Sequence, residues 1–66
     1  MRLIINGETR DFTTTITIME LLEIIGLAGK FVAVERNHEV VSYTKYGEVT
    51  LADGDRIEIV TLVGGG

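Results

Sequence analysis

The sequence predicts an α+β roll, in which a mixed sheet of four to five strands carries one main helix packed on one face. Three observations lead to this prediction: β-prone runs on both sides of Asn6-Gly7, a helical period that begins at Thr17, and a strand pattern around Ile57. With 66 residues the chain makes one domain with a single small core.

The first element is a hairpin. Asn6-Gly7 is a strong signal for a two-residue turn, because both central turn positions need a positive φ. Strands are therefore predicted at Met1–Asn6 and roughly Glu8–Thr13. Leu3 and Ile5 point to one face of the first strand, which has to meet the core.

The helix begins after Thr17. The sequence TIME has the spacing of a capping box, in which the Thr17 hydroxyl and the Glu20 carboxylate each take a free backbone N–H. Gly26 supplies the left-handed residue that ends the helix. The apolar stripe consists of Ile18, Leu21, Leu22 and Ile25.

A second pair of strands follows in FVAVERN and EVV, joined by a turn in which His38 stands where glycine would be easier. The pattern weakens at 42–51, where a short helical turn is expected. Tyr43 and Tyr46 are predicted to cover the edge of the core.

Asp53-Gly54-Asp55 predicts a turn before the last strand, in which Ile57 and Ile59 alternate with charged residues. Two aspartates in one tight turn lack the further oxygen ligands of a calcium loop, so no metal site is predicted. A last strand that returns to the middle of the sheet completes a β-grasp outline.

Composition limits the function classes. The net charge of −4 argues against nucleic acid and suits a basic partner. The chain has no cysteine, secretory signal or bilayer-spanning run, so we expect a cytoplasmic protein that is not membrane-bound and is monomeric when free. One histidine and no cysteine make side-chain nucleophilic catalysis improbable, and we expect no bound cofactor.

The last strand predicts a partner-binding surface, because the alternation fails after Ile59. Apolar side chains on the face away from the core, with charges at the rim, are typical of such surfaces. The alternative is that 42–51 covers part of this set. The predicted surface consists of Ile4, Arg56, Glu58, Val60 and Leu62.

The sequence finishes VGGG, which divides the chain into a domain at 1–63 and a flexible glycine tail at 64–66. Three residues without a Cβ can thread a narrow channel and present the Gly66 carboxylate to another protein's active site. Gly64 and Gly65 form the approach. A carboxylate needs activation, for which adenylation by ATP is the ordinary route.

The whole chain resembles the ThiS sulfur carrier proteins of thiamine biosynthesis, which are ubiquitin-like β-grasp domains. The resemblance rests on the order and spacing of several motifs: MRLIING, TIMELLE, FVAVERN with EVV, ADGDRIEIV and VGGG. His38, Ser42 and Tyr46 depart from the common family pattern of Gly, Pro and Trp.

The resemblance implies that Gly65 and Gly66 match the family's C-terminal Gly-Gly. A ThiF-like adenylyltransferase would use ATP to form the Gly66 acyl-adenylate, and a sulfur donor such as a cysteine desulfurase would lead to a thiocarboxylate. A ThiG-like thiazole synthase would take that sulfur. The chain would be a protein co-substrate and no enzyme itself.

The sequence leaves three alternatives open. The first is the related carrier of molybdopterin synthase, which has the same fold and Gly-Gly end but is usually longer. The second is a ubiquitin-like modifier that is joined to lysines, and the third is a β-grasp binding module whose tail is inert.

Overall fold

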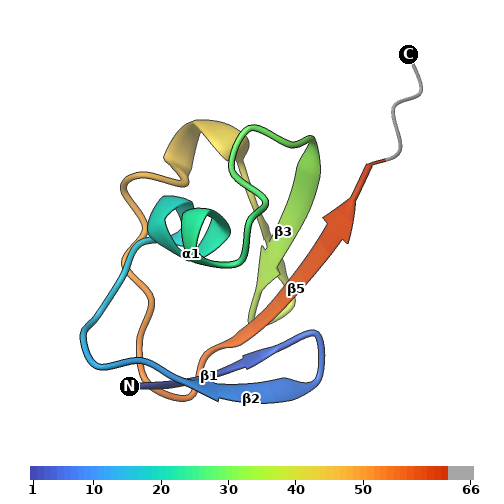
Figure 1. The fold of residues 1–66 in the computed structure, drawn as a ribbon. Coiled ribbons are helices and arrows are strands. Elements are labelled where there is room, and N and C mark those ends of the chain that lie inside the picture. Colours follow the sequence, from blue (N-terminus) through green and yellow to red (C-terminus); the bar gives the residue numbers. More distant parts are fainter. Residues whose placement is uncertain (63–66) are drawn as a thin grey trace.

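The computed structural model describes residues 1–62, and within them five strands form one sheet in the order β2-β1-β5-β3-β4 (Figure 1). The predicted glycine tail at 64–66 lies outside the described residues. The elements are β1 (Arg2–Ile5), β2 (Glu8–Asp11), α1 (Ile18–Ile24), β3 (Val32–Arg36), β4 (Glu39–Val41), the 3₁₀ helix η1 (Tyr43–Lys45) and β5 (Arg56–Thr61).

The last strand lies in the middle of the sheet, as predicted. β5 runs parallel to β1, with Ile4 beside Arg56, and antiparallel to β3, with Val34 beside Ile59. Both outer pairs, β1 with β2 and β3 with β4, are antiparallel hairpins. The sheet is therefore mixed, and the β-grasp prediction is confirmed.

Both hairpin turns use positive φ angles. Asn6 and Gly7 have φ of 49° and 83°, which confirms the first turn, and Asn37 and His38 have φ of 51° and 70°. His38 thus occupies the left-handed region, in which His, like Asn and Asp, is found more often than other residues that carry a side chain. The first two strands are shorter than predicted, because Asn6 already belongs to the turn and β2 ends at Asp11.

The predicted capping box begins the helix. The Glu20 N–H donates to Thr17 Oγ1 at 3.1 Å, and the Thr17 N–H donates to Glu20 Oε1 at 2.9 Å. Such a cap contributes about 1 kcal/mol. At the other end Gly26 has φ of 81°, and the Leu27 N–H reaches Leu22 O at 2.7 Å, as in a Schellman motif.

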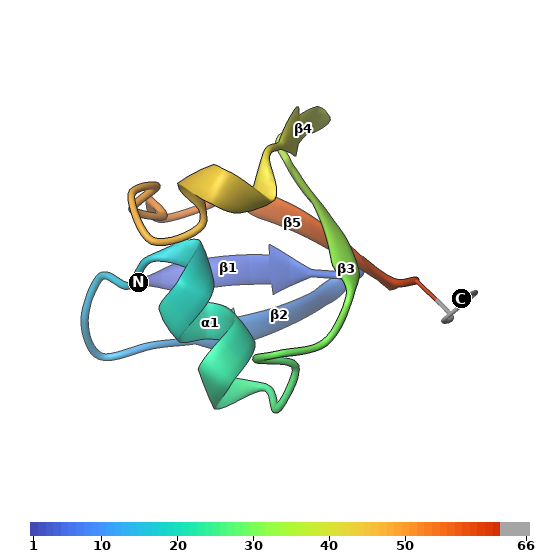
Figure 2. The same cartoon turned by 90° about the horizontal axis from the view of Figure 1, so that it is seen from above.

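α1 lies across one face of the sheet (Figure 2). Its apolar stripe meets the alternate residues of the three inner strands, which are buried on the same face. The core consists of Leu3, Ile5, Ile16, Ile18, Leu21, Leu22, Val34, Tyr46, Leu51, Ile57 and Ile59. Among residues 1–62 no helix has the length and apolar character needed to cross a membrane.

The two tyrosines of the 42–51 segment have different environments. Tyr46 is buried, and its hydroxyl donates to Val32 O at 3.2 Å. Tyr43 lies at the edge of the core, in one groove with the core residues Leu22 and Tyr46, but it is 77% exposed and is not buried there as Tyr46 is.

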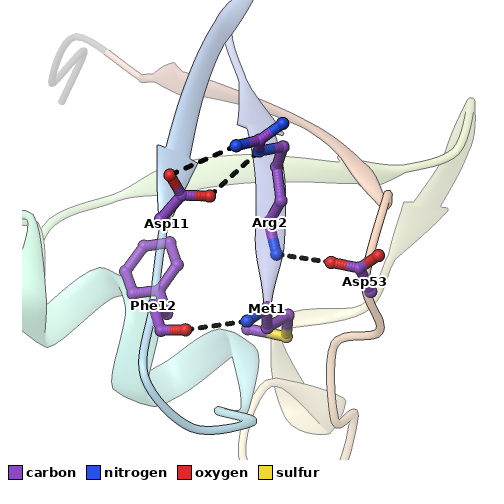
Figure 3. A network of polar contacts seen from close by, with 5 residues as sticks. All are labelled: Met1, Arg2, Asp11, Phe12 and Asp53. Atoms are coloured by element: carbon purple, nitrogen blue, oxygen red, sulfur yellow. Dashed lines mark hydrogen bonds and ion pairs between the residues drawn. The ribbon is translucent and has the colours of Figure 1, made fainter.

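Polar contacts of Arg2 join β1 to two segments, the strand β2 and the turn that precedes β5 (Figure 3). Arg2 Nε donates to Asp11 Oδ1 at 2.9 Å, and the Arg2 N–H donates to Asp53 Oδ1 at 2.6 Å. The hydrogen bond and charge of Arg2 lower the pKa of Asp11. These contacts connect β2 and the turn before β5 to the same strand.

Candidate functional site

β5 is the element that leads toward the predicted reactive end of the chain (Figure 1). Its position between β1 and β3 fixes the strand on both sides. After Thr61 the Leu62 N–H still donates to Phe31 O at 2.8 Å. The predicted site residues Gly64, Gly65 and Gly66 lie outside the described residues, so the described part of the site is the strand before them.

The Asn6 side chain extends the pairing of β5 beyond the end of β1. Its Nδ2 donates to Ile59 O at 3.1 Å, and its Oδ1 accepts from the Ile59 N–H at 2.7 Å. The carboxamide thus takes the place of a backbone peptide on the neighbouring strand. Asn6 therefore holds the half of β5 that lies closest to the tail, a role that the turn signal in the sequence did not reveal.

A second asparagine side chain forms hydrogen bonds at the start of β5. Asn37 Oδ1 accepts from the Arg56 N–H at 2.9 Å, and its Nδ2 donates to Asp55 Oδ1 at 2.9 Å. Both asparagines are the first residue of a hairpin turn with positive φ. The two turns therefore support the central strand from opposite sides, through the side chains of the two asparagines in addition to their backbone N–H groups.

We expect Asn6→Gly to lower the free energy of unfolding by about 2 kcal/mol, because two hydrogen bonds to a partly buried peptide are lost. Glycine keeps the positive φ without strain but gives the unfolded chain more freedom, so exchange at the Ile59 amide is needed to identify the part that the carboxamide contributes. Denaturant unfolding measures the stability, and hydrogen exchange measures the Ile59 amide. An unchanged exchange rate at Ile59 would show that the carboxamide does not hold β5.

Asp55 is the buried charged group at the start of β5. It accepts from Arg36 Nε at 2.8 Å, from Asn37 Nδ2 at 2.9 Å and from the Ala52 N–H at 2.8 Å. Burial by itself raises the pKa of Asp55, but these three hydrogen bonds together with the Arg36 charge lower it below its ordinary value. The neighbouring Asp53 accepts the Arg2 N–H, so both aspartates serve the turn.

The structure groups no three acidic or histidine side chains within residues 1–62 that could hold a metal ion. Two hydroxyls that a nucleophile search would consider have structural partners. Thr17 caps α1, and Ser42 Oγ accepts from the Thr44 N–H at the start of η1.

The predicted partner surface is divided between two places. Strand register puts Ile4 beside Arg56, Glu35 beside Glu58 and Ala33 beside Val60, so four of the five predicted residues belong to the sheet face away from α1. Leu62 instead lines a groove on the helix side, together with residues of α1 and η1. Val60 and Leu62 are both more than half exposed, so the 42–51 segment does not bury them.

Two carboxylates face each other on that open sheet face. Glu35 and Glu58 are exposed partners in the β3–β5 register. Like charges directly opposite on neighbouring strands destabilise a sheet. Together with the net charge of −4, the pair favours approach by a basic surface.

The fold and the central position of β5 define a small β-grasp protein, and a solved structure agrees with this class. The crystal structure of the thiamine biosynthesis protein (ThiS) from Geobacter metallireducens has a TM-score of 0.85 and 32% sequence identity. The match covers 100% of both chains.

The chain belongs to the ThiS family, whose model matches residues 3–66. The sulfur carrier protein ThiS of Bacillus subtilis is 52% identical over 50 residues, which are 76% of each chain. The thiazole synthase of Paramagnetospirillum magneticum is 47% identical over 66 residues, which cover 100% of this chain and 20% of that protein. The chain therefore spans about one fifth of the length of this relative.

Proposed function

We propose that the chain is a sulfur carrier protein of thiamine biosynthesis and that the Gly66 carboxylate is its functional group. The observation that carries this proposal is the family match, which extends through the terminal glycines to residue 66. The similarity to the ThiS carrier of Bacillus subtilis supports the same assignment.

The proposed chemistry activates the Gly66 carboxylate and then replaces one of its oxygens by sulfur. A carboxylate oxygen of Gly66 attacks the α-phosphorus of ATP in a ThiF-like adenylyltransferase, and pyrophosphate leaves. The outer sulfur of a persulfide, held by a cysteine desulfurase or a similar protein, then attacks the acyl-adenylate, and AMP leaves with the original oxygen. Two thiols reduce the resulting acyl disulfide and become a disulfide themselves, which releases the donor's thiol and leaves Gly66 with a thiocarboxylate.

The chain's own part is to carry and present this sulfur. β5 and its two asparagine contacts hold the strand before the tail, while the glycines add no side chain to the approach. Tethering keeps the sulfur at a high effective concentration without releasing free sulfide. The chain acts as a co-substrate that is used again after each transfer.

The proposed acceptor of the sulfur is a thiazole synthase. A protein named thiazole synthase contains a region 47% identical to the entire chain, which supports a close functional relation between carrier and synthase. When a sulfur carrier and the enzyme that uses its sulfur are linked in one polypeptide, their encounter is intramolecular and takes place at a high effective concentration.

The test uses the 66-residue chain with a free carboxylate at Gly66. We expect incubation with a ThiF-like adenylyltransferase, ATP and a sulfur donor to replace one oxygen by sulfur in the intact mass. The Bacillus subtilis carrier serves as the positive control for the enzyme. An unchanged mass, with the control converted, would contradict the proposal, and conjugates on lysines of other proteins would point to a modifier instead.

A further inference from the structure

An apolar groove of about 570 Å³ lies between α1, the loop that follows it, η1 and the end of β5. Its inner residues, Leu22 and Tyr46, belong to the core and are nearly fully buried. Its rim is made by large apolar side chains that remain in contact with solvent. We call it the Phe31 groove, and its rim residues are Met19, Phe31, Tyr43 and Leu62.

Exposed apolar side chains gather at this groove. Seven large hydrophobic residues are exposed in the described part of the chain, and four of them form this rim. Aromatic residues and methionine are the types enriched in the centres of protein interfaces. A second hollow, of about 470 Å³ beside β4, is lined by charged residues as well as apolar ones and lacks this concentration.

The groove is continuous with the segment that leads to Gly66. Leu62 is the last described residue, and it lies on the rim with its N–H bonded to Phe31 O at 2.8 Å. Four further residues span at most about 14 Å when fully extended. An enzyme that holds the Gly66 carboxylate in its active site therefore has to bind close to the Phe31 groove.

The groove carries a positive charge, whereas the net charge of the whole chain is negative. Lys30 is the one charged residue in the described lining, and it forms no ion pair within residues 1–62. The chain as a whole carries a net charge of −4. The chemistry that fits this groove is therefore an apolar segment with a carboxylate opposite Lys30.

We propose that the Phe31 groove receives an apolar segment, with one acidic side chain facing Lys30, of the enzyme that adenylates Gly66. This inference rests on the proposed function, because it identifies the surface through which that enzyme recognises the carrier. It also moves the partner site from the charged sheet face to the helix side of Leu62.

The test compares two equally exposed positions. Phe31 and Val40 are 79% and 78% exposed, and Val40 lies on β4 outside the groove. We expect Phe31→Ser to raise the KM of the adenylyltransferase for the carrier about tenfold with little change in kcat. Val40→Ser should leave both constants within about twofold of the native values. Lys30→Glu should raise KM as well, by placing an acidic group opposite the partner's carboxylate.

The outcomes separate the inference from the proposed function. If the native chain is not adenylated while the Bacillus subtilis carrier is, the proposed function fails. If the native chain is adenylated and Phe31→Ser keeps its KM, the inference fails alone. Thermal unfolding of both serine variants confirms that each is folded.

Other occupants of the groove would also be recognised. Sedimentation equilibrium of the native chain tests for a second copy, and a dimer that Phe31→Ser dissociates without changing KM would overturn the proposal. Reduced sulfur transfer to thiazole synthase from the thiocarboxylate form of Phe31→Ser, with normal adenylation, would assign the groove to the synthase and overturn it too.

Discussion

Asp55→Ala is expected to lower the free energy of unfolding by about 3 kcal/mol, because it removes the acceptor of three hydrogen bonds in a buried position. The Ala52 N–H and the Asn37 amide would be left without that partner, and Arg36 would lose its ion pair. Domains of this size have a total stability of only about 3–10 kcal/mol. Thermal unfolding should therefore show a midpoint lowered by about 10–20 °C.

The matched control is Asp53→Ala, two residues earlier in the same turn. Asp53 is exposed and accepts one hydrogen bond, from the Arg2 N–H. Its loss should reduce stability by about 1 kcal/mol or less. Equal losses of stability from the two substitutions would show that the buried network at Asp55 stabilises the fold no more than the single hydrogen bond of Asp53.

The stability that Asp55 contributes should also depend on pH. Its pKa is lower in the folded chain than the ordinary value of 3.8, so folding favours the ionised form. The contribution is therefore complete above that ordinary value and is lost as the pH falls through the folded pKa. We expect the stability difference between the native chain and Asp55→Asn to shrink below about pH 4. A difference that grows with acidity would contradict this sign.

Deleting Gly65 and Gly66 is expected to abolish sulfur loading while leaving stability within about 0.5 kcal/mol of the native value. The fold's described contacts end at the Leu62–Phe31 hydrogen bond, so the deletion removes none of them. Intact mass after incubation with adenylyltransferase, ATP and sulfur donor measures the loading. Denaturant unfolding measures the stability.

A chain with one alanine added after Gly66 is the second arm of that experiment. It keeps every native residue but moves the carboxylate onto a residue with a Cβ. We expect this chain to fold normally and to be adenylated far more slowly. Normal loading of the truncated chain, or its unfolding, would contradict the assignment of the glycine end as reactive group.

The sequence was sufficient to predict most of the fold, because local signals and the tertiary structure agree. Asn6-Gly7, the Thr17 capping box and Gly26 each have one main structural interpretation, and each is found as predicted. The alternation around Ile57 likewise predicted a half-buried strand, whose place in the sheet follows from the β-grasp order.

The parts that could not be predicted depend on contacts between distant residues. The bonds from Asn6 to Ile59 and from Asn37 to Arg56 join residues far apart in the chain, and a turn signal says nothing about them. Strand alternation predicts that Leu62 lies on the same face as Val60, but β5 ends at Thr61 and Leu62 lines the Phe31 groove. The clustering of Phe31 and Tyr43 there has no signal in the local sequence.

The most direct test of the central claim is to locate the sulfur within the loaded chain. After incubation with adenylyltransferase, ATP and sulfur donor, fragmentation of the intact protein in a mass spectrometer assigns the mass change to a residue. We predict that every fragment containing Gly66 carries sulfur in place of one oxygen and that all other fragments keep their native mass. Sulfur on any other residue, or a loaded chain whose Gly66 fragments are unchanged, would contradict the account.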